Sequence, residues 1–93
     1  MNLEILTSKY IASAEKVLNE MKETAGSFTI DETEVRKVVE WVRAYLADAK
    51  YYKAQNRLET SLTSVAYCEG LLDALRLLGA VKFEWPANPM GER

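Results

Sequence analysis

The chain has 93 residues, 48% apolar and 28% charged, which is the composition of one globular domain rather than of a disordered segment. Its 12 basic and 14 acidic residues give a net charge of −2, so overall charge does not favour binding to nucleic acid or to an anionic membrane. The sequence has no histidine and one cysteine, Cys68, which excludes histidine-based catalytic triads, histidine metal sites and an intramolecular disulfide.

The first predicted helix covers residues 2–25. Gly26 is expected to end it, because glycine readily adopts the left-handed conformation found after helix ends. Apolar residues recur there at three- and four-residue steps, as one face of a helix requires. They are Leu3, Leu6, Tyr10, Ala14, Val17 and Met21.

The second predicted helix covers residues 32–54. Thr29 and Asp31 are both possible N-caps, and each has a glutamate three residues later that can complete a capping box. The apolar stripe of this helix alternates three- and four-residue steps for six turns. It consists of Val35, Val38, Val42, Tyr45, Ala49 and Tyr52.

The third predicted helix covers residues 58–78, with Gly79 at its end. A tight break over residues 53–57 separates it from the second helix, because the apolar stripe changes phase there; the alternative is one continuous helix. Three helices of similar length with short connections predict an all-α fold, an up-down-up three-helix bundle in one domain over residues 1–93, with a C-terminal extended tail over residues 80–93.

The third helix is apolar around most of its circumference, so two neighbouring helices cannot cover it completely. Two covers are available: the tail, in which Val81, Phe83 and Trp85 alternate with charged residues, or a second copy of the chain. We expect the tail to dock on the bundle through Trp85 and to leave a smaller apolar patch for a dimer or a partner. Leu72 and Leu75 are expected to be buried.

The segment Tyr67–Gly79, which reads Tyr-Cys-Glu-Gly-Leu-Leu-Asp-Ala-Leu-Arg-Leu-Leu-Gly, and the cluster at residues 48–52 resemble the short archaeal family called domain of unknown function 357. Members often carry a Tyr-Ala-x-Gly-Leu-Leu-Asp-Ala-Leu-like segment. They usually have Gly-Asp in the turn between the last two helices, where this chain has Ala54-Gln55-Asn56-Arg57. The resemblance implies an archaeal, cytoplasmic, all-helical protein, and it implies no activity.

Three charged residues of the third helix, Glu69, Asp73 and Arg76, form a polar stripe. Glu69 and Asp73 are four residues apart on one face and can bind a divalent cation together. Alternatively, Asp73 pairs with Arg76 three residues later, and Glu69 pairs with a group on another helix. We favour the second interpretation, because the pattern matches the paired acidic motifs of helical pyrophosphatases poorly.

A basic edge is spaced by seven residues along and beyond the second helix: Arg36, Arg43, Lys50 and Arg57. It can follow a phosphate backbone, or Glu32 and Glu40 can neutralise it, which we favour. The aromatic flank formed by Trp41, Tyr45 and Tyr52 fits the border of a core better than a binding site, although such residues are common at interface hot spots. Cys68 is expected to be a core residue.

These patterns predict a non-enzymatic protein-interaction or accessory module without a cofactor, which binds a protein partner or forms a homodimer in the cytoplasm. Leu77, Leu78 and Trp85, with the aromatic flank, are its candidate interaction surface. Two alternatives remain: a carboxylate–metal nucleotide-binding protein or hydrolase that uses Glu69 and Asp73, and a nucleic-acid-binding protein that uses the basic edge. The sequence has no segment long and apolar enough for a membrane span and no signal-peptide pattern.

Overall fold

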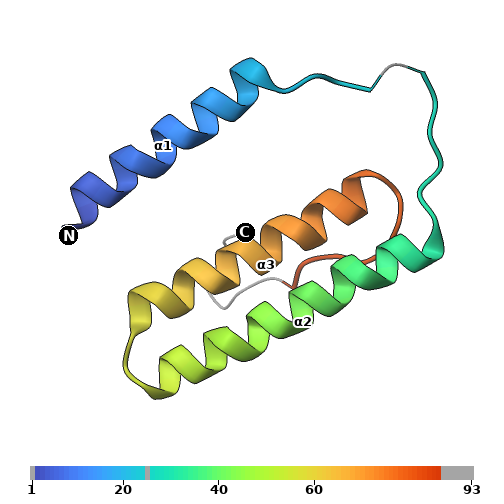
Figure 1. The fold of residues 1–93 in the computed structure, drawn as a ribbon. Coiled ribbons are helices and arrows are strands. Elements are labelled where there is room, and N and C mark those ends of the chain that lie inside the picture. Colours follow the sequence, from blue (N-terminus) through green and yellow to red (C-terminus); the bar gives the residue numbers. More distant parts are fainter. Residues whose placement is uncertain (1, 25, 87–93) are drawn as a thin grey trace.

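The fold is all-α. The computed structural model describes residues 2–24 and 26–86, and within them it forms helices α1 (Leu3–Glu20), α2 (Glu32–Ala54) and α3 (Leu58–Leu77) and no strand (Figure 1). Successive helices run in opposite directions, so the up-down-up three-helix arrangement predicted from the sequence is confirmed. Residues 87–93 of the predicted tail lie outside the described residues.

The turn between α2 and α3 depends on Asn56, which adopts a left-handed conformation with φ of 57°. Its backbone N–H donates to the Lys53 carbonyl at 3.0 Å, and the N–H of Arg57 donates to the Tyr52 carbonyl at 2.9 Å. These two bonds form a Schellman motif, which satisfies carbonyl groups at the end of α2. Asparagine tolerates this conformation better than most residues, so Asn56 closes the turn without a glycine.

Gly79 ends α3 in the same way. It has φ of 79°, its N–H donates to the Arg76 carbonyl at 3.0 Å, and the Ala80 N–H donates to the Leu75 carbonyl at 2.9 Å. The predicted stop is therefore confirmed, and it turns the chain back toward α3.

The core lies between α2 and α3, which form an antiparallel hairpin. Its buried apolar residues are Val42 and Ala49 from α2 and Cys68 and Leu75 from α3. Leu72, expected to be buried, is only half-buried, because it lies on the flank of α3 rather than at the centre of the contact with α2.

Two hydrogen bonds link the helices of this hairpin. The hydroxyl of the buried Ser61 donates to the Ala49 carbonyl at 2.7 Å, and the Cys68 thiol donates to the Val42 carbonyl at 3.4 Å. Burial raises the pKa of the Cys68 thiol, a backbone hydrogen bond opposes that shift, and the charges of Asp48 and Glu69 add to it. A buried thiol with a raised pKa is a poor nucleophile, so Cys68 is a core residue, as predicted.

Helix α1 is shorter than predicted, because it ends at Glu20 rather than at residue 25, and Met21 is already extended with ψ of 151°. Its last turn contains Glu20 and no basic residue, an unfavourable charge at the negative end of a helix dipole. Gly26 is left-handed as expected, with φ of 85°, but it lies in the connection rather than at the helix end.

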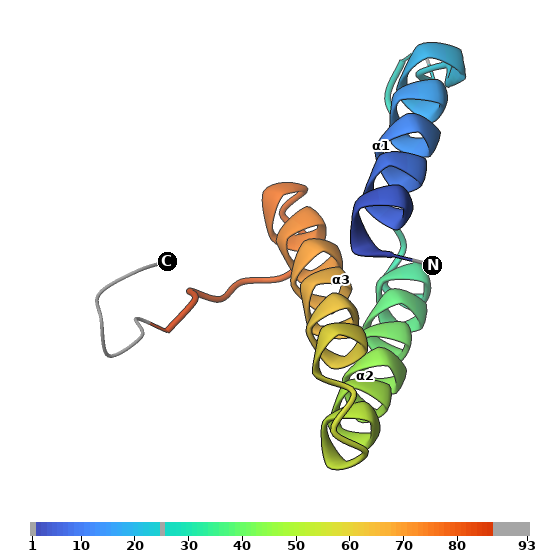
Figure 2. The ribbon, with the colours of Figure 1, turned by 90° about the vertical axis from the view of Figure 1, so that its left-hand side faces the viewer.

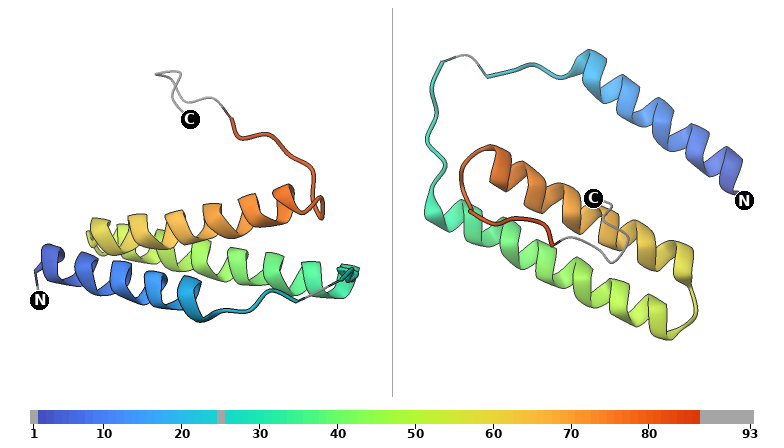
Figure 3. Two further views of the ribbon diagram at one scale, coloured as in Figure 1. Left: turned by 90° about the horizontal axis from the view of Figure 1, so that it is seen from above. Right: turned by 180° about the vertical axis from the view of Figure 1, so that it is seen from behind.

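Helix α1 lies beside α3, and it buries none of its residues. Figures 2 and 3 show α1 on one side of the α2/α3 hairpin and the tail on the opposite side. The hairpin therefore has two separate surfaces, one that the tail contacts and one that faces α1.

Candidate functional site

The polar stripe is the docking site of the tail. The indole N–H of Trp85 donates to Asp73 Oδ1 at 2.7 Å. The same carboxylate oxygen accepts a hydrogen bond from Arg76 Nη2 at 3.2 Å, one turn further along α3. Asp73 therefore has a structural role in this arrangement, because it connects the tail to the helix.

Aromatic contacts extend this docking site. The rings of Phe83 and Trp85 meet edge to face with centroids 4.9 Å apart, and the Arg76 guanidinium lies 5.8 Å from the centroid of Phe83. Val81, Phe83 and Trp85 are half-buried, whereas Lys82 and Glu84 between them are exposed. The predicted alternation and the predicted docking through Trp85 are both present in residues 80–86.

Asp73→Ala is expected to release Trp85, because it removes the acceptor of the indole N–H. In a Trp41→Phe background, Trp85 is the only tryptophan, and its fluorescence should shift to the red and become more accessible to acrylamide. Glu84→Ala, which removes an exposed carboxylate of the tail, is the matched control. Unchanged emission in the Asp73 variant would show that the hydrogen bond does not hold the tail.

Glu69, the third member of the polar stripe, is half-buried beside Cys68, and its charge contributes to the raised pKa of that thiol. Among residues 2–24 and 26–86, no three acidic or cysteine side chains lie close enough together to hold a metal ion.

The basic edge is exposed, and two of its arginines have acidic partners. Arg36 pairs with Glu32, and Arg43 Nε lies 3.5 Å from Glu40 Oε1. Arg57 at the end of the edge stacks over the ring of Tyr52, with its guanidinium carbon 4.8 Å from the centroid. These contacts correspond to the neutralised edge that the sequence favours.

The structure separates the predicted aromatic flank. Tyr45 packs edge to face on Tyr67 of α3, with centroids 4.7 Å apart, and Tyr52 is half-buried beneath Arg57. Trp41 is 62% exposed and lines a shallow hollow with Val38. Trp41 is thus the most exposed residue of this flank, Tyr45 is 38% exposed beside Tyr67, and Tyr52 is half-buried.

Helix α1 carries an exposed apolar surface that the sequence analysis did not propose as an interaction surface. We call it the α1 face, and it consists of Leu3, Leu6, Tyr10, Ile11, Ala14, Val17 and Leu18. All of these residues are exposed except Leu6, which is half-buried. Tyr10, Ile11 and Leu18 are 63%, 55% and 65% exposed. A groove of about 600 Å³ separates it from Glu59, Thr60 and Thr63 of α3. The periodicity of α1 shows an apolar face, but it does not show whether the hairpin covers that face.

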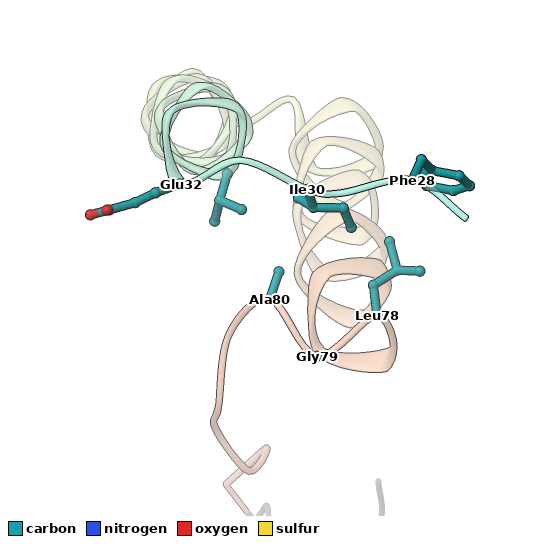
Figure 4. Close-up of a pocket in the computed structure, with 7 residues that line it drawn as sticks. Phe28, Ile30, Glu32, Leu78, Gly79 and Ala80 are labelled. Carbon is teal, nitrogen blue, oxygen red and sulfur yellow. The ribbon is translucent and has the colours of Figure 1, made fainter. Parts of the chain in front are cut away.

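A second hollow lies at the open end of the hairpin (Figure 4). Phe28 and Ile30 of the connection between α1 and α2 lie over Leu78 and Ala80, around a cavity of about 480 Å³. Leu78 and Leu77 remain largely exposed, as the apolar circumference of α3 predicts. Phe28 and Ile30 thus bring the part of the connection next to α2 close to the end of α3, although both side chains stay exposed.

No helix in the described part of the chain has the length and apolar character needed to cross a membrane. Neither the curated proteins nor the solved structures contain a significant match to this chain. One protein family does match, over residues 9–81, and this range contains all of α2 and α3 and most of α1. The chain thus belongs to the family described as "Protein of unknown function (DUF357)", as the Tyr67–Gly79 segment predicts.

Proposed function

We propose that the chain is a non-enzymatic interaction module that binds the apolar face of a helix in a protein partner. The observation that carries this proposal is the α1 face, a helical surface that α2 and α3 leave exposed beside a groove of about 600 Å³. Exposed apolar patches of this extent usually mark contact sites, and an amphipathic helix lying in an apolar groove is a common way to cover them.

The contacts of the polar stripe support this proposal over carboxylate–metal catalysis. Asp73, the acidic residue most suited to a metal site by its position, accepts hydrogen bonds from Trp85 and Arg76. Two of the four residues of the basic edge, Arg36 and Arg43, likewise have acidic neighbours, which lowers the net positive charge of that edge. The α1 face has no comparable internal partner within the described residues.

A displayed library of peptides with apolar residues at helical spacing tests the proposal, together with a library of the same composition in scrambled order. We expect binders only from the patterned library. Ile11→Glu, which places a charge in the α1 face, should weaken their binding at least about tenfold. The control is Ala12→Glu, on the opposite, exposed side of α1, which should leave binding unchanged.

Two results would contradict the proposal. Equal yields from both libraries would show that the surface does not recognise helical spacing. Binders that tolerate Ile11→Glu would show that recognition takes place on another surface. Circular dichroism of both variants confirms that the helices are retained.

A further inference from the structure

We propose that the partner of the α1 face is a second copy of this chain, and that α1 of one copy packs against α3 of the other. This inference rests on the proposed function and names its partner. It starts from an unmet physical requirement: most of the stability of a helix in a protein comes from the packing of its apolar face, and α1 has no buried residue.

The exposed area of the chain fits an interface between copies. The chain exposes 8275 Å², whereas a compact monomer of its mass exposes about 5,400 Å², an excess of about 2,900 Å². Permanent homodimers commonly bury about 1,000–2,500 Å² from each chain. The total covers the whole chain, so the excess includes the connection between α1 and α2 as well as the α1 face. A second copy of the chain is large enough to cover the α1 face, whereas a small ligand is not.

The side of α3 that faces away from α2 offers the complementary surface. We call it the small face of α3, because its residues are short and exposed: Thr63, Ala66, Gly70 and Ala74. A methyl group added at Gly70 would meet no other part of the chain within 4 Å. The exposed side chains of Leu62 and Leu77 lie at the two ends of this face. Between them the short side chains let another helix approach α3 closely, and the large side chains of the α1 face can pack there.

Two-fold symmetry then satisfies both surfaces at once. Each copy carries one α1 face and one small face, so a symmetric pair makes the same contact twice. The connection is long enough to place α1 on a neighbouring copy. Residues 21–31 can span up to about 36 Å, which exceeds the length of about 27 Å expected for α1 itself. Within one chain, by contrast, a groove of about 600 Å³ separates α1 from α3.

Sedimentation velocity over a range of concentrations tests the inference with substitutions on both faces. Wild type should form a dimer. Gly70→Gln should weaken the dimer at least about tenfold, because the added side chain occupies the small face. Since glutamine favours helix more than glycine does, this loss cannot result from a less stable α3. Ile11→Glu should have the same effect, and Ala44→Gln, on the exposed outer side of α2, should have none.

Disulfide trapping identifies which helices meet. A tagged Thr7→Cys chain and an untagged Thr63→Cys chain, mixed and oxidised, should give a disulfide-linked heterodimer, because both positions line the groove between α1 and α3. Ala12→Cys in place of Thr7→Cys should give none. In the double variant, a disulfide within one chain would show that α1 closes on its own hairpin and would overturn the inference.

The outcomes separate this inference from the proposed function. A chain that is monomeric at every concentration overturns the inference, whereas patterned peptides that still depend on Ile11 would continue to support helix binding. A dimer that Gly70→Gln and Ile11→Glu leave intact also overturns it, because the copies would then meet through other surfaces. If the trapped heterodimer forms but no patterned peptide binds, the result supports the dimer and contradicts the proposal that the chain binds helices of other proteins.

Discussion

Leu75→Ala is expected to lower the free energy of unfolding by about 2–5 kcal/mol, because it leaves a cavity at the centre of the α2/α3 contact. Leu75 is 6% exposed and is one of the few large side chains buried in the hairpin. Total stabilities of small domains are about 5–15 kcal/mol, so the loss is a large share of the whole. Urea denaturation followed by circular dichroism measures it.

Leu77→Ala is the matched control for this experiment. Leu77 lies two residues further along α3 and is 77% exposed, so its truncation should change the unfolding free energy by no more than about 0.5 kcal/mol. Equal effects of the two substitutions would mean that the hairpin does not have its core where Leu75 lies.

Ending the chain at Ala80 is expected to lower the free energy of unfolding by about 2 kcal/mol or more. The truncation removes the hydrogen bond from Trp85 to the charged Asp73, and it removes the apolar burial of the Phe83 and Trp85 side chains, which are half-buried beside Asp73 and Arg76. The uncovered surface should also make the shortened chain associate more readily, which sedimentation velocity measures.

A chain that ends at Pro86 is the control, since it keeps every contact described for the tail. It should match the full-length chain in its free energy of unfolding and in its association state. If the chain ending at Ala80 matches it as well, the tail contributes nothing to the fold, and the docking of Trp85 is incidental.

The helices of the hairpin were predictable because local signals and tertiary packing agree there. The start of α2 after Asp31 and the ends of α2 and α3 follow from capping and from left-handed residues, and all lie within one residue of the predicted bounds. The early end of α1 was not predictable from periodicity, because Met21 continues the apolar spacing. The end of α1 coincides with an acidic residue, Glu20, at the negative end of the helix dipole, and α1 has no buried residue that would extend it by packing.

The candidate surfaces were predictable only in part. Alternation identified Val81, Phe83 and Trp85 as a covering segment, and the spacing of Asp73 and Arg76 identified their ion pair. The α1 face was missed because an amphipathic helix has the same sequence pattern whether its apolar side is covered by its own chain or left for another. Only the positions of the helices relative to one another distinguish these two cases.

Hydrogen–deuterium exchange of α1, measured at low and at high chain concentration, tests the central claim most directly, because that claim is that α1 is covered by another molecule. The backbone amides of residues 6–20 should exchange at least about tenfold more slowly at high concentration, while those of α2 and α3 change little. Protection of α1 that is independent of concentration would mean that the chain covers α1 itself, and it would contradict the account.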